Sequence, residues 1–516
     1  MSKSNSKLKI IIGLVCVILA ACIAAATVFV IRPYYYENNY IAPIPTNLST
    51  GWSNEPEPIF SDFYVSPNGS ANGNGSLERP FATIEQAKVA VRKMKKDQVS
   101  HAVIAIMAGT YNIDSTEFTE KDSGTEICRV IYSAYGDGEV IFDGGIQSGT
   151  AFEPSNDALI EIKNGKYITF SGITFRNCPG VAIRASGSNI DISSCTVMNT
   201  AGNGIEINGS SISVNGCNIS STGASAITIN GGNRKTLKEG SCSADNNLIS
   251  STSQFDKTAP SVIIGGTGNS LTHNEIVNSP SAAIYYSGNA NKIEYNYIHN
   301  TCLDGINIFA IDSPERWDYY GNFVRYNLIS TIGNGTDEVG GICACSGTQV
   351  RGNMFINIKG AGISFGGGRD INFTNNILVN CNVPLNYYTS TAGADNKAWE
   401  ELKKSPYQTD AWKKAYPECA ALKTDYADMT DASFAANPAN SIIKDNIILH
   451  KSAEIGTISP EANNYSSIGD NMVLNLSQTK IFIDAKGGNY RIDESSNVSE
   501  TLPDYRDIPF DSIGRY

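Results

Sequence analysis

The sequence Gly204-Ile205-Glu206-Ile207 returns further along the chain as Ala226-Ile227-Thr228-Ile229. Ahead of each copy stands a second short piece, Cys195-Thr196-Val197 and then Cys217-Asn218-Ile219, and both pieces recur at the same interval. Apolar residues at every second position are typical of a half-buried strand, not of a helix with its 3.6-residue period. The chain from residue 166 to residue 385 is therefore interpreted as short strands repeated at a fixed step.

The same step resumes after an insertion. It separates Asn274 from Asn296, Ile276 from Ile298 and Ile284 from Ile306. A step in the low twenties, with short strands separated by Gly, Asn and Ser, is typical of a β-solenoid in which each coil stacks on the previous one. Stacking also predicts that equivalent Asn side chains form hydrogen-bonded ladders along the axis. The predicted fold class is all-β, a single parallel β-helix.

Composition limits the possible partners of the protein. The 516 residues are 41% hydrophobic, enough for a large core, and the repeat indicates one elongated body. The formal net charge of −12 argues against nucleic acid as a partner. Most of the twelve cysteines are interpreted as buried apolar fillers. Cys343 and Cys345 form a close pair, but they lack matching His or Cys partners, so no metal site is predicted.

The N-terminal segment predicts export. Residues 1–9 carry three lysines, and residues 10–31 form an uncharged run long enough to cross a bilayer as a helix. Positive charge before this run places the N-terminus in the cytoplasm, so we expect a single-pass cell-membrane protein with an extracellular body. Two alternatives remain open: a lipoprotein cleaved at Leu19-Ala20-Ala21-Cys22, or a secreted protein cleaved after Ala26.

Four parts follow along the chain. Residues 1–9 are the cytoplasmic N-terminus and 10–31 the transmembrane signal anchor. Residues 32–60, rich in Tyr, Asn and Pro, are predicted to be a linker. Residues 61–516 are the β-helix domain, with a helix-prone insertion at 386–440.

The start of the domain predicts a cap. Residues 83–96 have a helical apolar period, and a helix there would cover the open end of a solenoid. Around it, Tyr64-Val65-Ser66, Pro80-Phe81-Ala82-Thr83-Ile84 and Gly109-Thr110-Tyr111 resemble the N-terminal end of exported right-handed parallel β-helix proteins, the pectate-lyase-like family related to glycoside hydrolases. The resemblance runs from about residue 62 to residue 445, and it implies a right-handed coil and a carbohydrate substrate.

The resemblance also implies a site. In related hydrolases an acidic residue stands before a Gly-Ala-Ile-like strand, a position matched here by Asp304 ahead of Gly305-Ile306-Asn307-Ile308. An acidic pair is expected on the next coil, but residues 341–347 carry Cys343 and Cys345 there instead. Glycoside cleavage needs two carboxyl groups about 5–9.5 Å apart. Four loop residues are candidates for the second carboxyl group: Asp312, Asp337, Glu338 and Asp370.

Long loops cluster around residues 296–386, where we expect a cleft. The candidate catalytic residues are Asp304, Asp312 and Asp370, and the candidate substrate-binding residues are Trp317, Glu338, Arg369, Tyr387 and Trp399. Alternatives are left open for several of them. Asp304 could instead be a carboxylate that caps a turn. The aromatic rings, including Tyr388, could instead pack the insertion onto the coils, and Arg369 and Asp370 could form an internal ion pair.

Three functions are compatible with the sequence. The first is a cell-surface glycoside-hydrolase-like protein acting on a polysaccharide through acid and base carboxyl groups. The second is a non-catalytic surface module that binds a glycan or a protein partner, favoured by the missing acidic pair. The third is a polysaccharide lyase with an Arg or Lys base and Ca²⁺. No cofactor is expected, except Ca²⁺ for the lyase.

Overall fold

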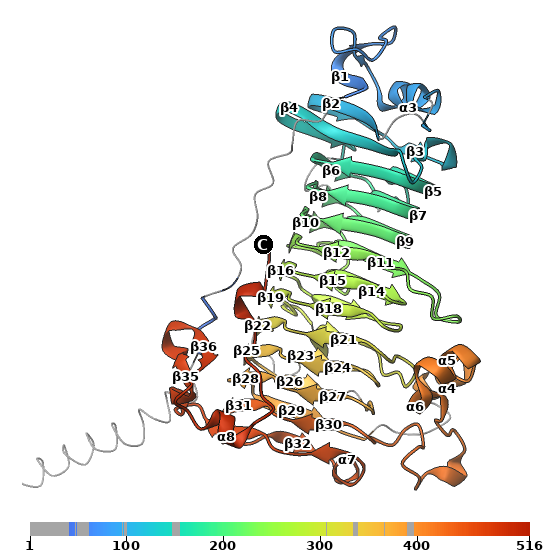
Figure 1. Cartoon of the computed structure of the whole chain (residues 1–516). Helices are drawn as coiled ribbons and strands as arrows, with labels where there is room; N and C mark the ends of the chain where they lie inside the picture. Colours follow the sequence, from blue (N-terminus) through green and yellow to red (C-terminus); the bar gives the residue numbers. More distant parts are fainter. Residues whose placement is uncertain are drawn as a thin grey trace, which may run out of the picture.

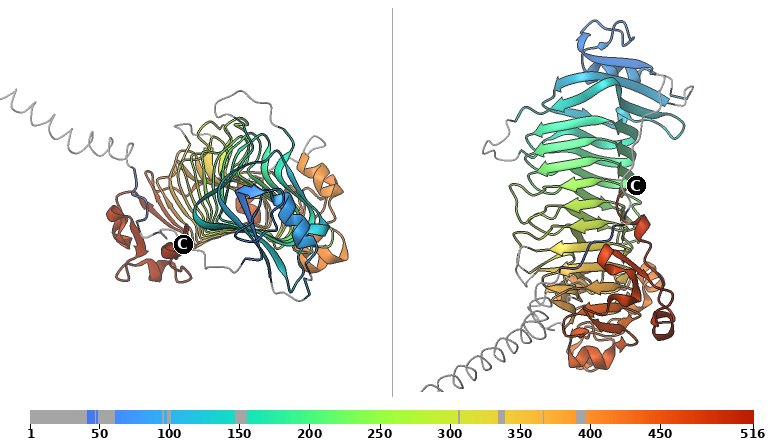
Figure 2. Two further views of the ribbon diagram at one scale, coloured as in Figure 1. Left: turned by 90° about the horizontal axis from the view of Figure 1, so that it is seen from above. Right: turned by 90° about the vertical axis from the view of Figure 1, so that its left-hand side faces the viewer.

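The computed structural model describes residues 41–46, 48, 61–94, 96–97, 101–146, 155–305, 307–333, 339–365, 367–389 and 397–516. Nearly all of its strands join one 34-stranded sheet that winds around a central apolar core as a parallel β-helix (Figure 1). Seen along the axis, the coils lie one behind another around a common centre (Figure 2). The predicted fold class is therefore confirmed for the body of the chain.

The β-helix begins with long strands. β1 (Phe63–Ser70), β2 (His101–Asn112), β3 (Thr116–Phe118), β4 (Arg129–Asp143), β5 (Ala158–Ser171), β7 (Val181–Ser193) and β9 (Ile205–Asn215) form the first coils. Each later coil has three short strands, which form three stacks.

Stack one contains β12 (Ser243–Asp245), β15 (Ser270–Thr272), β18 (Lys292–Glu294), β21 (Phe323–Arg325), β24 (Gln349–Arg351), β27 (Asn372–Thr374), β30 (Ile442–Lys444) and β33 (Ser467–Ile468). Stack two contains β6 (Ile173–Cys178), β8 (Thr196–Thr200), β10 (Asn218–Thr222), β13 (Leu248–Ser250), β16 (Glu275–Val277), β19 (Tyr297–His299), β22 (Leu328–Ile332), β25 (Met354–Ile358), β28 (Ile377–Val379), β31 (Ile447–His450) and β34 (Met472–Asn475). Stack three contains β11 (Ile227–Gly231), β14 (Val262–Gly266), β17 (Ile284–Tyr286), β20 (Ile308–Asp312), β23 (Val339–Cys343), β26 (Ala361–Ser364), β29 (Val383–Tyr387) and β32 (Gly456–Ile458).

An asparagine ladder occupies the turn between stacks one and two. Each side-chain NH₂ group donates to the Oδ1 atom of the next Asn at 2.8–3.1 Å, and that Oδ1 also accepts from the backbone N–H one coil back. The ladder satisfies polar groups inside the coil, as stacking requires. Its members are Asn247, Asn274, Asn296, Asn327, Asn353, Asn376, Asn446 and Asn471.

The predicted register holds for most coils and fails at one. Ile205 pairs with Ile183 on one side and with Ile227 on the other, each one repeat away, as the repeat predicts. Ile284, however, pairs with Ile311, five positions beyond the predicted partner at residue 306. The chain inserts five extra residues, and β20 begins at Ile308, so Gly305 and Asn307 do not belong to a strand as predicted; residue 306 lies outside the described residues.

The N-terminal cap is present. α3 (Ile84–Arg92) begins at Thr83, whose side chain and that of Gln86 form a capping box, and it buries Ile84, Ala87 and Val91 against the first coils. The helix ends four residues before the predicted boundary at residue 96.

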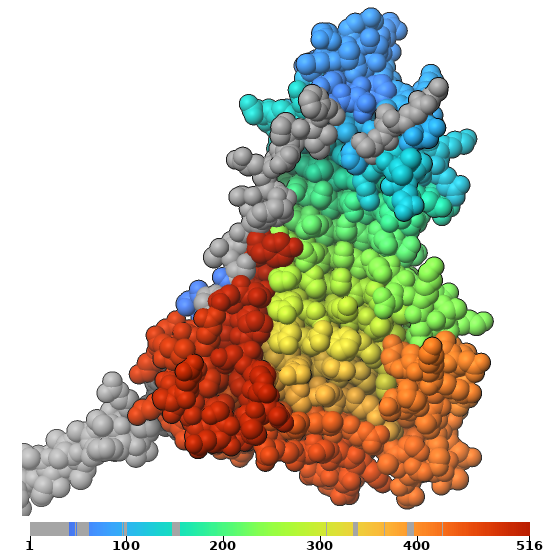
Figure 3. All heavy atoms as spheres, viewed as in Figure 1, coloured from blue at the N-terminus to red at the C-terminus, as the bar shows by residue number. Residues whose placement is uncertain are grey.

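Two additions cover opposite sides of the later coils (Figures 1 and 2). The insertion carries α4 (Lys397–Lys404), α5 (Asp410–Ala415) and α6 (Pro417–Ala420), which confirms its predicted helical character. α7 (Pro460–Tyr465) lies in the last coil, between β32 and β33, and the C-terminal segment, residues 476–516, carries α8 (Val498–Thr501) and the hairpin of β35 (Phe482–Asp484) and β36 (Asn489–Ile492). Figure 3 shows this segment lying along the side of the coils.

The C-terminal segment seals an apolar surface of stack two. Phe510 and Ile513 pack on outward-facing residues such as Leu328, Met354 and Ile377. Strands β22 to β31 are therefore buried on both faces, which a repeat count alone does not reveal.

Part of the predicted linker is bound to this body. Ala42 exchanges two backbone hydrogen bonds of 2.9 Å with the Asn357 side chain, and the Tyr490 hydroxyl donates to Pro43 O at 2.8 Å. The predicted membrane segment, residues 10–31, lies outside the described residues. Within the part of the chain that the structure describes, no helix has the length and hydropathy needed to span a bilayer.

Candidate active site

The site lies on the outer surface of stack three. β17 and β20 pair so that Tyr285 lies beside Asp312, and one coil further Ile311 pairs with Ile342, which places Cys343 next in the column. The alternation of the strands turns the isoleucines into the core and the intervening residues outward. Asp312 is thus a carboxyl group on the outer surface, held between a phenol and a thiol.

Burial changes the acidity of Asp312. Burial raises the pKa of this carboxyl group to about 6, and hydrogen bonds from the backbone of Ser313 and Phe309 offset only part of the rise. Ser313 N–H lies 2.9 Å from Asp312 Oδ1. A carboxyl group that still holds its proton near pH 6 is suited to general acid catalysis.

A second carboxyl group lies close by. Glu315 and Asp312 both contribute to raising the pKa of the Cys343 thiol well above its ordinary value, after the larger effect of burial. Both also act on Tyr388, whose pKa is raised to about 12, chiefly by burial and then by Cys343. The two carboxyl groups therefore share the same surroundings. Tyr388, with 43% of its surface exposed, presents a ring beside them.

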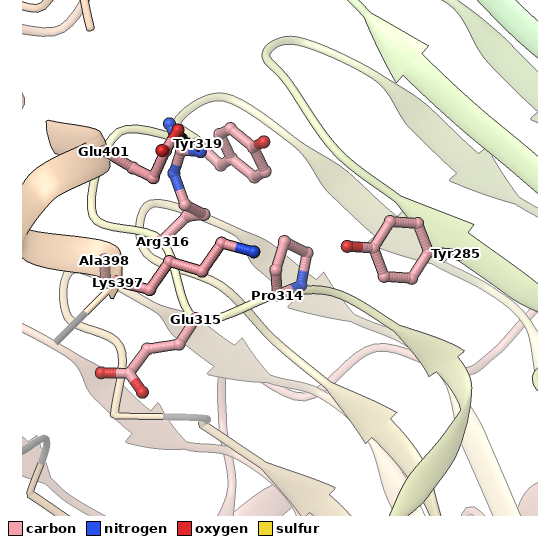
Figure 4. Close-up of a pocket in the computed structure, with 8 residues that line it drawn as sticks. All are labelled: Tyr285, Pro314, Glu315, Arg316, Tyr319, Lys397, Ala398 and Glu401. Carbon is pink, nitrogen blue, oxygen red and sulfur yellow. Dashed lines mark hydrogen bonds and ion pairs between the residues drawn. The ribbon is translucent and has the colours of Figure 1, made fainter. Parts of the chain in front are cut away.

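A pocket of about 660 Å³ opens between this surface and α4. Tyr285, Pro314 and Glu315 line it from the coils, and Lys397 and Glu401 line it from the insertion. In Figure 4 the Tyr285 hydroxyl and the Lys397 ammonium group point towards Pro314 from opposite sides, and Glu315 extends away from them. Burial raises the pKa of Tyr285 to about 12, so this residue stays a neutral phenol.

Arg316 fixes the pocket wall. Its guanidinium donates to both Asp318 oxygens at 2.8 and 2.9 Å and to Glu401 Oε2 at 3.1 Å. It also lies 4.6 Å over the Tyr319 ring. The bidentate pair with the fully buried Asp318 fixes the guanidinium, and the bond to Glu401 ties the loop after β20 to α4. In the described ranges no group of three or more His, Cys, Asp or Glu side chains is arranged to hold a metal ion.

Asp304 is separated from this constellation. It is exposed, and its backbone N–H donates to Pro280 O, ahead of β17, whereas Asp312 lies beside Tyr285 within β17. The five-residue insertion explains why Asp304 lies elsewhere than predicted. The sequence repeat had matched residue 306 to residue 284 and so had placed Asp304 directly before a strand. Glu338, like Asp337, lies outside the described residues.

The aromatic candidates divide by burial. Trp317, Trp399 and Tyr387 are each at most 1% exposed, so they present no ring face to a sugar. Trp317 packs edge-on against Trp399 at 6.0 Å inside the cluster that holds the insertion. These three rings therefore pack inside the protein, as the alternative interpretation predicted, and are not available to stack on a sugar. The outward ring is that of Tyr388, one position beyond Tyr387.

Arg369 and Asp370 form an internal ion pair. Arg369 Nε lies 2.7 Å from Asp370 Oδ2, and Arg369 Nη1 donates to the carbonyls of Ala432 and Phe434 at 2.9 Å. Tyr320 also donates to Asp370 Oδ2, at 2.5 Å. Arg369 is 2% exposed, so the pair links the insertion to the coils and does not face the pocket.

Five residues that line the pocket were not predicted from the sequence: Tyr285, Glu315, Arg316, Lys397 and Glu401. Glu315 could have been predicted as a site residue, because it stands three residues after Asp312 in a predicted long loop. The others meet only through folding, since Tyr285 and Glu401 are more than a hundred residues apart.

Comparisons with known proteins agree on the architecture. The structure of XylC with xylose has a TM-score of 0.52 at 12% identity, covering 84% of this chain and 88% of that chain. A mutant of the PL6 family alginate lyase AlyGC has a TM-score of 0.50 at 14% identity, covering 75% of this chain and 50% of that one. At these identities the similarity shows the fold. No curated protein matches significantly in sequence.

Two sequence profiles match the chain directly. Residues 63–234 match a Pel9A-like right-handed β-helix region, and residues 203–397 match a right-handed β-helix region. The matches overlap and together run through most of the coils, including the site surface. The chain therefore carries a pectate-lyase-like right-handed parallel β-helix.

Proposed function

We propose that this protein is a carbohydrate-active enzyme of the glycoside hydrolase type, acting on a polysaccharide at the surface formed by Asp312, Glu315 and Tyr388. The observation that carries the proposal is the raised pKa of Asp312, about 6, beside a second carboxyl group and an exposed aromatic ring. The matches to pectate-lyase-like β-helices support a carbohydrate as the substrate class.

Each residue has a defined part in the proposed reaction. Protonated Asp312 donates its proton to the glycosidic oxygen of the leaving sugar. Glu315 acts from the other side of the bond, either as a base on a water molecule or as a nucleophile on the anomeric carbon. Tyr388 and Tyr285 offer ring surfaces on which sugars stack. The Arg316 ion pairs hold the pocket wall in place.

Activity on a glycan panel tests the proposal. Full-length protein, purified in detergent, is compared with Asp312→Asn and Glu315→Gln by measuring the release of reducing ends. Both variants are expected to lose about 10²- to 10⁴-fold in kcat, the usual contribution of a general acid or base. Asp137→Asn, an exposed carboxyl group on β4, is the matched control. Turnover that survives in Asp312→Asn removes Asp312 from the mechanism.

The principal alternative is a glycan-binding module without catalysis. Cys343 favours it, because a thiol with a strongly raised pKa stands where related hydrolases carry a carboxyl group. Glycan binding by the wild type without any release of reducing ends supports this alternative. A lyase gives a third outcome, Ca²⁺-dependent formation of unsaturated sugars that absorb ultraviolet light.

We also propose that the body is displayed at the cell surface, with residues 10–31 as its membrane anchor; lipoprotein attachment and secretion are the alternatives. Residues 41–46 are bound to the coils, so at most nine residues separate the apolar run from the folded body. Fractionation of cells, with labelling by a membrane-impermeant reagent, tests this location.

A further inference from the structure

The C-terminal segment contains a second pocket, separate from the one beside α4. It has a volume of about 390 Å³, and its walls are the end of β36, the turn after it, α8 and residues 502–507. Pockets that hold small molecules usually measure about 300–1,000 Å³. The apolar part of the wall includes Val498, Leu502 and Pro503.

The coils hold one wall of this pocket in place. The buried Asn375 side chain exchanges two hydrogen bonds of 2.6 Å with the backbone of Arg506. Asp507 Oδ1 accepts from the Ile492 N–H at 3.2 Å, which joins the same wall to the end of β36. Because the wall is tied at both places, little conformational freedom is left to lose when a ligand binds.

Two hydroxyl groups in the wall lack a partner. The Tyr505 hydroxyl and Ser496 Oγ are buried, and neither has a hydrogen-bond partner among the described residues. Tyr505 as a whole is 8% exposed. Burial, and then the negative charge of Asp507, raise the pKa of Tyr505 well above its ordinary value, so it stays a neutral phenol. A buried hydroxyl without a partner is costly, and a ligand that bonds to it removes that cost.

The charges that line the pocket are mostly negative. Asp493, Glu494 and Asp507 stand against the single cation Arg506, so three carboxylates and one guanidinium give a formal net charge of −2. Arg506 donates from Nη1 to two backbone carbonyl oxygens, at 2.7 and 3.0 Å. Asp493 stays ionised, because hydrogen bonds from Ser495 hold the pKa of its carboxyl group below the ordinary value.

We infer that this pocket binds a small organic cation, a primary ammonium group carried on an aliphatic stem or on a sugar ring. The carboxylates attract its charge, and the two hydroxyl oxygens can accept hydrogen bonds from its N–H groups. The apolar part of the wall contacts its carbon skeleton. A neutral molecule lacks the charge that balances the carboxylates, and an anion is repelled. This site is independent of the reaction proposed at Asp312.

Titration calorimetry of the full-length protein in detergent tests the site with three probes: 1,5-diaminopentane, glucosamine and glucose. At pH 6 both amines are protonated. We expect both to bind, with affinities that fall as the salt concentration rises. Glucose differs from glucosamine only by a hydroxyl in place of the ammonium group, so it is the matched neutral probe and is expected not to bind.

Two variants locate the binding. Asp507→Asn keeps the oxygen that accepts from the Ile492 N–H but loses the charge, and it should weaken amine binding about fivefold. Tyr505→Phe removes only the unpartnered hydroxyl, so it should weaken binding about threefold without lowering the thermal stability of the free protein. Glu500→Gln, an exposed carboxyl group on α8 outside the lining, is the matched control.

The outcomes decide between the alternatives. Binding of either amine that weakens in both variants supports the site, and the amine that binds more tightly identifies the aliphatic or the sugar source. Glucose that binds as tightly as glucosamine overturns the preference for a cation. Amine binding that is unchanged in both variants occurs elsewhere and overturns the site, as does a failure of both amines to bind. None of these results depends on activity at Asp312.

Discussion

Asp312 and Tyr285 occupy equivalent positions on adjacent coils, because β20 and β17 pair in register at these two residues. A strand spacing of about 4.8 Å brings their outward side chains into one column. Burial of the carboxyl group at this place in the column raises the pKa of Asp312 to about 6. The position of Asp312 in the coil therefore sets the acidity of its carboxyl group.

The pH dependence of activity follows from this pKa. We expect kcat/KM to fall as the pH rises through about 6, because the required acid loses its proton. The measurement is a pH profile on whichever glycan is cleaved. A profile whose alkaline limb has its midpoint well above pH 8 would assign the proton donor to another group.

The stability of the protein should depend on the same group. The folded-state pKa of Asp312 lies above its ordinary value of 3.8, so its favourable contribution is complete below about pH 4 and is lost as the pH rises through 6. The loss is on the order of 3 kcal/mol. Asp312→Asn should flatten this part of the stability curve, measured by urea unfolding between pH 4 and 7. If the unfolding free energy changes equally with pH in the wild type and in the variant, the prediction is wrong.

The asparagine ladder should be most sensitive at its centre. Asn327→Ala leaves the Asn296 N–H and the Ile293 carbonyl without their buried partners, at an expected cost of about 3 kcal/mol in unfolding free energy. Asn471→Ala, at the half-buried end of the same ladder, is the control and should cost less than about half as much. If both variants lose the same unfolding free energy in chemical denaturation, burial does not determine the cost of removing a ladder asparagine.

The Arg369–Asp370 pair should hold the insertion in place. Arg369→Met leaves Asp370 buried without its cation, which costs about 3–5 kcal/mol locally. Limited proteolysis is expected to cut within residues 397–440 first. Adding Asp370→Asn to this variant should restore part of the resistance, because the unpaired charge is gone. If the double variant is cut faster than the single one, the ion pair is not the cause.

The C-terminal segment should stabilise the coils through apolar contacts. Phe510 is 1% exposed on the outer surface of stack two, so Phe510→Ala is expected to cost about 3–5 kcal/mol and to increase binding of a hydrophobic dye. Ile483→Ala, at a side chain that is 56% exposed on the same segment, is the control and should change the unfolding free energy by less than about 0.5 kcal/mol. Similar thermal shifts for both variants would argue against a seal at Phe510.

The repeat made most of the fold predictable. Ile183, Ile205 and Ile227 sit at a constant step, and the structure pairs them as that step requires. The asparagine ladder was predictable for the same reason, since a side chain that repeats once per coil meets its own copy above and below. The helix at residues 84–92 followed from its apolar period.

The site was less predictable, because counting residues does not show where a loop absorbs an insertion. The constant step of the repeat placed Ile306 above Ile284, whereas the fold uses Ile311 and so brings Asp312, not Asp304, beside Tyr285. The alternation of side chains at the end of β29 turns Tyr387 inward and Tyr388, the next residue, outward.

The sequence by itself determined the coil, its ladders and its cap, since these depend on contacts between residues one repeat apart. Only the tertiary structure decided which carboxyl group is buried and which aromatic ring is exposed. Asp312 lies beside Tyr285 of the previous coil, and Cys343 follows on the next coil, so its burial depends on segments that meet only when the coils stack. The acidity of a carboxyl group is set by all of its surroundings in space, and a linear sequence specifies only its nearest neighbours.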